Sequence, residues 1–90
     1  SHGDPFVHVE ERIADIIRHH EHRLNQLRAY VHTWTTVYEA YLCLFGQKPL
    51  TVHDMSFAVG ETVAHLEYLV EKGELEKEEN GEGPWLYRRL

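Results

Sequence analysis

The stretch "ETVAHLEYLVEKGELEKEE", residues 61–79, predicts an amphipathic helix that ends at a glycine and is followed by a strand. Its apolar residues recur at helical spacing as far as Val70, and Gly73 stands where a residue after a helix C-cap is expected. The alternating "ELEKEE" that follows is typical of a strand. These nineteen residues hold seven glutamates and only two lysines. The helix-then-strand shape is common in DNA-binding domains, but its charge would repel phosphate.

A long first helix is predicted before this stretch. Asp4 and Pro5 offer an N-cap and a first-turn proline, although the helix could also start near His8. Apolar residues and one histidine then recur at steps of three and four, which is the pattern of one helix face. The members of this stripe are Phe6, Val9, Ile13, Ile16, Ile17, His20, Leu24, Leu27 and Val31. The opposite face is expected to be solvated, with Arg12, Asp15, Arg18, His19, His22 and Arg23.

Two further helices follow the first. Thr36 and Glu39 have the spacing of a capping box, which predicts a second helix that closes at Gly46. A third helix is expected to begin between Thr51 and Ser56 and to run to Lys72. Its main apolar stripe is Met55, Val59, Val63, Leu66 and Val70, with Leu69 at the edge.

The remaining residues predict a β-hairpin from about Leu75 to Arg88, because "ELEKEE" and "WLYRR" flank the turn sequence "NGEGP". The order is therefore long helix, helix, helix and hairpin. We expect a mainly α domain of three helices with a small β-hairpin, similar to a winged helix with a long first helix. Its core is expected to contain Ile13, Ile17, Leu24, Tyr38, Leu42, Val59, Val63, Leu66 and Val70.

Length and composition favour one folded domain. The chain has 90 residues, of which 42% are hydrophobic, and a formal net charge of −6. Chains split into several cores only at two or three times this length. The single cysteine, Cys43, lies in an apolar run and cannot form an internal disulfide, so a reducing, cytoplasmic location is expected. No apolar run approaches the roughly 20 residues that span a bilayer, so no membrane partner is expected.

Nucleic acid is not expected as a partner. A recognition helix needs Arg, Lys, Asn or Gln to reach base edges. Residues 56–72 offer one lysine at the very end and carry Glu61, Glu67 and Glu71 instead. Each of these carboxylates opposes the phosphate contacts that DNA binding requires.

A second stripe on the third helix has two interpretations. Phe57, Ala64 and Tyr68 fall together, about 120° from the main stripe at 100° per residue. They could fill the gap to the hairpin or to the first helix. Alternatively, they form a docking surface for another domain or subunit, because exposed aromatic patches usually mark interfaces.

The chain contains eight histidines, which raises the question of metal binding. His19 and His22 are three residues apart on the first helix, close enough to chelate in principle. A structural zinc site needs four ligands, however, and no cysteine pair or H-E-x-x-H motif is present. We expect adventitious or structural roles for this pair and a packed position for His20. No catalytic residue is expected, because no phosphate loop, nucleophile elbow or activated cysteine is visible.

Four segments together resemble a known family. They are "HGDPF" at 2–6, "RIADIIRHHEHRLNQL" at 12–27, "TVYEAYLCLFG" at 36–46 and "AVGETVAHLEYLVEKGELEKEE" at 58–79. In this order they resemble the C-terminal end of metallo-β-lactamase-fold hydrolases, in which a long helix and a small winged-helix tail follow the catalytic domain. The last segment is the most specific, because it combines "GE", "AHL" and "L..G" at fixed spacing.

The resemblance implies a division of the chain and a role for it. Residues 1–6 would be the end of the upstream catalytic domain, or an expression scar, and residues 7–90 would be the C-terminal domain. The H-x-H-x-D-H metal motif is absent here, and only His2 aligns with the family's last metal-ligand histidine. The fragment would therefore hold no cofactor by itself, whereas the parent hydrolase would hold zinc, as two ions.

Two classes of function remain after this comparison of motifs. The first is a non-catalytic accessory domain that docks on the catalytic domain of the same chain and shapes the substrate entrance. Its expected interface residues are His20, Arg23, Phe57, Ala64 and Tyr68. The second is a free-standing winged-helix domain with an interaction or regulatory role. In the first class, the alternative to docking is that the tail only solubilises or dimerises the enzyme, so a homodimer also stays open.

Overall fold

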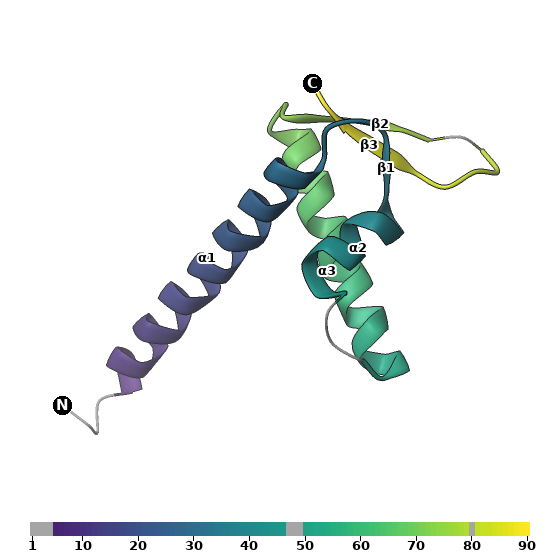
Figure 1. Cartoon of the computed structure of the whole chain (residues 1–90). Coiled ribbons are helices and arrows are strands. Elements are labelled where there is room, and N and C mark those ends of the chain that lie inside the picture. Colours follow the sequence, from purple (N-terminus) through teal and green to yellow (C-terminus); the bar gives the residue numbers. More distant parts are fainter. Residues whose placement is uncertain (1–4, 47–49, 80) are drawn as a thin grey trace.

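The chain forms three helices and a small antiparallel sheet (Figure 1). The computed structural model describes residues 5–46, 50–79 and 81–90. Its elements are α1 (Pro5–Tyr30), β1 (Thr35–Thr36), α2 (Val37–Phe45), α3 (Val52–Glu71), β2 (Leu75–Glu78) and β3 (Leu86–Arg89). The predicted class is confirmed: the protein is mainly helical, with a long first helix and a C-terminal hairpin. Asp4, the expected N-cap of α1, lies outside the described residues.

The ends of α2 and α3 follow the local sequence signals. Thr36 and Glu39 form the predicted capping box: the Thr36 hydroxyl accepts from the Glu39 amide at 3.1 Å, and the Glu39 carboxylate accepts from the Thr36 amide at 3.0 Å. Thr51 caps α3 by accepting from the Asp54 amide at 3.1 Å. At the other end of α3, Gly73 has a φ of 78°, a conformation that glycine adopts without steric cost.

The sheet contains one strand that the sequence patterns do not reveal. β3 lies between β1 and β2, and both neighbours are antiparallel to it. β1 has two residues, Thr35 and Thr36, and the second of them is also the N-cap of α2. A strand this short shows no alternation of apolar and polar residues, so periodicity could not predict it.

The hydrophobic core joins the last turns of α1, one face of α2, the second half of α3 and the sheet. Its buried members are Leu24, Leu27, Val31, Ala40, Leu66, Leu69, Leu75 and Tyr87. Most of these residues come from the C-terminal ends of α1 and α3, where the two helices meet beside the hairpin (Figure 1). Among the described residues, no helix is both long and apolar enough to cross a membrane.

The core predicted from sequence is only partly correct. Leu24 and Leu66 are buried, and Val63 and Val70 are partly buried. The other expected members are exposed: Ile13, Ile17, Tyr38, Leu42 and Val59. For Ile13 and Ile17 the reason is visible in Figure 1, where α1 and α3 meet near their C-terminal ends and diverge toward their N-terminal ends. A continuous apolar stripe on α1 is therefore covered only in its second half.

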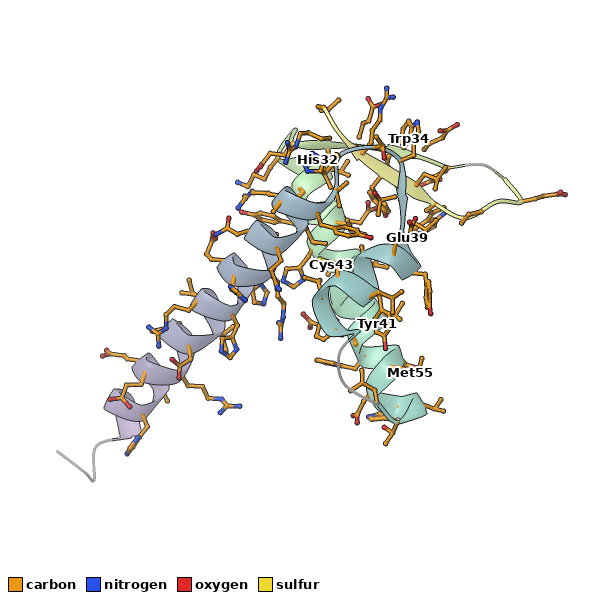
Figure 2. All side chains as sticks on the ribbon, in the orientation of Figure 1. His32, Trp34, Glu39, Tyr41, Cys43 and Met55 are labelled. Atoms are coloured by element: carbon orange, nitrogen blue, oxygen red, sulfur yellow. The ribbon has the colours of Figure 1, made fainter. Side chains whose placement is uncertain are left out.

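The buried face of α3 is also rotated from the predicted stripe. Its buried residues are Ala58, Thr62, His65, Leu66 and Leu69, whereas Met55 and Val59 remain exposed. Figure 2 shows Met55 near the start of α3, far from the sheet. Two polar residues occupy the buried face, and each makes one hydrogen bond to a backbone carbonyl of α3. The Thr62 hydroxyl donates to the Ala58 carbonyl at 2.8 Å, and a ring nitrogen of His65 lies 2.6 Å from the Glu61 carbonyl.

Candidate functional site

A cleft of about 470 Å³ lies between α1 and α3, on the side where the two helices begin to separate. Its walls are mainly apolar and carry four polar side chains. The lining residues are Ile16, Ile17, His20, Glu21, Leu24, Glu61, Ala64, His65 and Tyr68. Pockets with apolar walls and a few convergent polar groups are the usual form of binding sites.

The helical period explains why these residues meet. The α1 residues fall at steps of three and four from Ile16 to Leu24, and the α3 residues do so from Glu61 to Tyr68. The cleft is thus formed by one face of each helix. Leu24 closes it at the core end, where the side chain is buried, whereas Ile17 stands at its open end and is exposed.

His65 is the most constrained polar residue in the cleft. Its side chain is 3% exposed, and its Nδ1 atom lies 2.6 Å from the backbone carbonyl of Glu61. This carbonyl can only accept, so Nδ1 is the donor, and in the neutral ring Nε2 carries a lone pair. Within the described residues, Nε2 is buried without a hydrogen-bond partner. Such an atom is costly to bury unless something binds it.

His20 and Glu61 stand beside His65. The rings of His20 and His65 have centroids 4.8 Å apart and are tilted by 43°. One ligand-capable atom from each of His20, Glu61 and His65 lies within 4.8 Å of the others. The packed position predicted for His20 is wrong, because its side chain is exposed. The sequence patterns also do not indicate that Glu61 and His65 are its neighbours. Their spacing of four residues on α3 is the signal that could have grouped them, but nothing local shows that this pair faces α1.

Arg23 connects the three helices at the edge of this cluster. Its guanidinium lies 3.8 Å from the Glu61 carboxylate on α3 and 5.4 Å from the centre of the Phe45 ring on α2. Arg23 is therefore partly buried and not part of a fully solvated face. Cation–π and ionic contacts of this kind help to orient α1 against its neighbours.

The structure brings together some of the expected interface residues. His20, Ala64 and Tyr68 line the cleft, and Arg23 reaches its wall through Glu61. Phe57 is 69% exposed and does not line the cleft. Tyr68 and Ala64 are exposed on the side facing α1, so they do not seal the gap between the helices.

The remaining candidates lie elsewhere. His19 and His22 are both exposed and do not belong to the His20, Glu61 and His65 cluster. His2 lies outside the described residues. Burial raises the pKa of the Cys43 thiol, which disfavours the reactive thiolate. Cys43 therefore has the properties of an inert packing residue.

Comparison with known proteins connects this fold to one family. Residues 24–90 match the family described as "Metallo-beta-lactamase-like, C-terminal domain". The structure is similar to the crystal structure of a β-lactamase domain protein from Burkholderia ambifaria, with a TM-score of 0.80 and 34% sequence identity. The similarity covers 91% of this chain but only 24% of that one. A comparison with curated protein sequences finds no match. Since the family match spans most of its length, the chain belongs to the metallo-β-lactamase-like C-terminal domain family.

Proposed function

We propose that this domain is a non-catalytic accessory domain that docks on the catalytic domain of a metal-dependent hydrolase. The observation that carries the proposal is the exposed apolar face on the first half of α1. Val9, Ile13 and Ile17 are 54%, 51% and 57% exposed. Among the described parts of the chain, Figure 2 shows no other element beside this half of the helix. Contiguous exposed apolar residues of this kind usually mark an interface.

The occupant that we propose is the upstream catalytic domain. The chain spans 24% of the Burkholderia protein, so a protein built like that neighbour has most of its length outside this domain. In a C-terminal domain, the preceding part of the protein connects to α1. The exposed half of α1 is then the surface nearest to the catalytic domain. The cleft between α1 and α3 continues this surface, with His20, Arg23, Ala64 and Tyr68 at its walls.

A position near the substrate entrance follows from the resemblance. By this resemblance His2 would take the place of the family's last metal-ligand histidine, and α1 begins at Pro5. Only two residues would then separate this ligand from α1, so the helix would leave the rim of the active site directly. The domain would form one wall of the entrance and influence which substrates reach the metal. We place the parent protein in the cytoplasm, which the free thiol of Cys43 favours.

The hydrolytic chemistry is not assigned to these 90 residues. In the parent, two bound zinc ions would supply an activated water. The chain contains no H-x-H-x-D-H motif. The metal-capable group found among the described residues, His20 with Glu61 and His65, belongs to no such motif. The donors present therefore do not fit the family's catalytic centre, and residues 1–90 alone are expected to hydrolyse nothing.

The test compares the same substitutions in two proteins. Ile13→Asp with Ile17→Asp places charge on the exposed apolar face. In the 90-residue chain the free energy of unfolding should change by no more than about 1 kcal/mol, because both side chains are exposed and each such site contributes about 0.5 kcal/mol or less. In the parent hydrolase the variant should lower the melting temperature by several degrees. It should also change the ratio of kcat/KM values for thioesters and phosphodiesters by threefold or more.

The control adds the same charge on the opposite face of α1, as His19→Asp with His22→Asp, two exposed positions. It should leave the parent's stability and specificity close to those of the unsubstituted protein. Unchanged stability and specificity of the Ile13→Asp, Ile17→Asp parent would contradict the proposal. A concentration-dependent dimer of the 90-residue chain that these substitutions abolish would also contradict it, because the surface would then serve a second copy.

A further inference from the structure

We propose that His20, Glu61 and His65 form a binding site for a divalent transition-metal ion, which links the middle of α1 to the middle of α3. This inference does not depend on the docking proposal. Three observations support it: the hydrogen bonding of His65, the chemistry of the three side chains and their positions in the cleft.

The hydrogen bonding of His65 matches that of a metal-ligating histidine. Such histidines almost always donate one ring N–H to a carboxylate, a backbone carbonyl or water, which fixes the tautomer and leaves the other nitrogen free. Here Nδ1 lies 2.6 Å from the Glu61 carbonyl, and Nε2 is buried without a partner within the described residues. A metal ion would provide the partner that this buried lone pair lacks.

The three side chains select the class of ion. Two imidazoles and one carboxylate suit zinc and its neighbours cobalt and nickel, whereas calcium and magnesium prefer sites made of oxygen ligands. The carboxylate also supplies negative charge that helps to neutralise a divalent ion. Three protein ligands leave one tetrahedral position for water.

The three ligand atoms must move slightly closer together to bind one ion. The ligand-capable atoms lie within 4.8 Å of one another, whereas ligands on one zinc ion lie within about 4 Å because each bond is about 2.0–2.2 Å. His65 is fixed by burial, but His20 is exposed on α1 and can turn toward the ion. The Glu61 carboxylate lies 3.8 Å from Arg23 and 3.9 Å from Nδ1 of His65, so its side chain must also turn toward Nε2. The ion would then take over the charge compensation that Arg23 provides.

A bound ion would have a defined structural effect. His20 is near the point where α1 leaves the core, and Glu61 and His65 are on the facing side of α3. Coordination would join the two helices just beyond Leu24, the last buried residue on this side of α1. The angle between α1 and α3 would then be fixed by the metal as well as by the core.

The experiment uses the 90-residue chain without a polyhistidine tag. Zinc binding is measured by isothermal titration calorimetry and by thermal unfolding, and Co²⁺ is used as a spectroscopic probe of the ligand set. We expect one ion per chain and a rise in melting temperature of about 5 °C at saturating zinc. His20→Ala and Glu61→Gln should each weaken binding by tenfold or more and change the visible spectrum of bound cobalt.

The matched control removes two histidines of the same helix that lie outside the cluster. His19→Ala with His22→Ala should leave the affinity, the stoichiometry and the cobalt spectrum unchanged. His65→Gln should abolish zinc binding. If this substitution unfolds the domain, His20→Ala still tests the proposal, because His20 is exposed and its loss should not unfold the protein. Absence of stoichiometric binding, binding that His20→Ala leaves unchanged, or binding lost in the His19, His22 variant would each overturn the proposal.

Discussion

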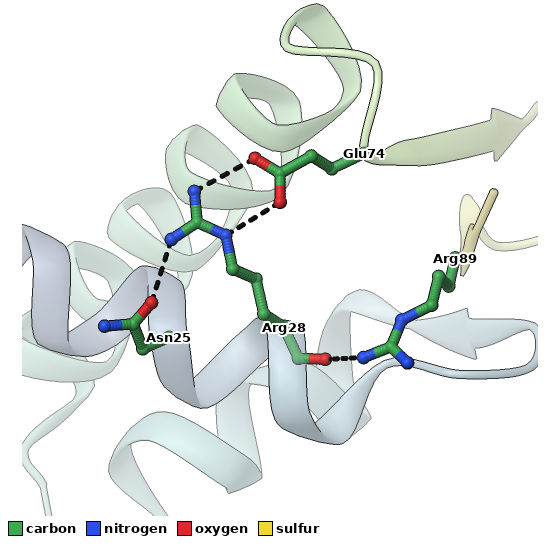
Figure 3. A network of polar contacts seen from close by, with 4 residues as sticks. All are labelled: Asn25, Arg28, Glu74 and Arg89. Atoms are coloured by element: carbon green, nitrogen blue, oxygen red, sulfur yellow. Dashed lines mark hydrogen bonds and ion pairs between the residues drawn. The ribbon is translucent and has the colours of Figure 1, made fainter.

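Arg28, in the last turn of α1, binds the carboxylate of Glu74 through two hydrogen bonds (Figure 3). Glu74 lies between the end of α3 and the start of β2. The Arg28 Nε atom donates to one carboxylate oxygen at 2.8 Å, and its Nη2 atom donates to the other at 3.0 Å. Asn25 accepts from the third nitrogen at 2.9 Å, and Arg89 donates to the Arg28 carbonyl. This bidentate pair joins the end of α1 to the start of β2.

The first prediction concerns the stability of the fold at acid pH. The hydrogen bonds from Arg28 hold the pKa of Glu74 below its ordinary value of 4.5. A lowered pKa in the folded state adds stability above about pH 4.5, and this stability is lost as the pH falls through the lowered value. Glu74→Gln should therefore lower the melting temperature at neutral pH but much less at pH 3. Thermal unfolding between pH 3 and neutral pH tests this prediction, with a substitution at an exposed position, Glu10→Gln, as the control. If Glu74→Gln lowered the melting temperature by the same amount at every pH, the prediction would be contradicted.

The second prediction concerns the stability of the fold at alkaline pH. Tyr87 is fully buried, and its hydroxyl donates to Glu67 at 3.1 Å, while Lys77 donates to the same carboxylate at 2.8 Å. Burial, followed by the charge of Glu67, raises the pKa of Tyr87 from 10.0 to about 12. This contribution to stability is complete below pH 10 and is lost as the pH rises through about 12.

Tyr87→Phe removes this ionisation together with one hydrogen bond. At neutral pH the variant should lose about 1 kcal/mol of unfolding free energy. Between pH 10 and pH 12 its stability should fall less steeply than that of the unsubstituted protein. Denaturant unfolding at a series of pH values measures both effects, and parallel pH profiles for the two proteins would refute the role assigned to the hydroxyl.

The third prediction separates the two halves of α1. Leu27 is fully buried and Ile13 is 51% exposed, although both belong to the same apolar stripe. Leu27→Ala should cost about 2–5 kcal/mol because it leaves a cavity. Ile13→Ala should change the unfolding free energy by no more than about 0.5 kcal/mol. Urea unfolding of both variants decides this, and similar losses in the two would mean that the first half of α1 is packed.

The fourth prediction concerns nucleic acid. The cations of the hairpin already have acidic or carbonyl partners: Lys77 contacts Glu67 and Glu79, Arg88 contacts Glu76, and Arg89 contacts the Arg28 carbonyl. With a net charge of −6, the chain should not shift duplex DNA at low micromolar protein and physiological salt. A mobility-shift assay measures this. Tight binding that weakens steeply with added salt would contradict the prediction and would direct attention to the arginines of α1.

The sequence predicts structural features, such as helix ends, that depend on contacts between residues close together in the chain. The capping box of Thr36 and Glu39 and the glycine at position 73 set helix ends through contacts a few residues apart. For that reason the bounds of α2, α3 and the hairpin are close to those expected. Family motifs in residues 58–79 likewise identify the C-terminal domain, because they depend on local spacing.

Features that depend on how helices cross were not predictable in this way. Periodicity shows that Ile13 and Leu27 share a face, but it does not show that α3 diverges before reaching Ile13. Burial of Thr62 and His65 depends on hydrogen bonds within α3 that hydrophobicity does not reveal. His20 and His65 are 45 positions apart (65 − 20), so only the fold brings their rings together.

The central claim is that the first half of α1 is a docking surface for the catalytic domain, and backbone hydrogen exchange tests it most directly. In the 90-residue chain, residues 8–18 are largely exposed, so their amides should exchange much faster than those of residues 24–30. In the parent hydrolase, exchange at residues 8–18 should slow by tenfold or more, while residues 24–30 should change little. Equal exchange rates at residues 8–18 in the two proteins would contradict the account.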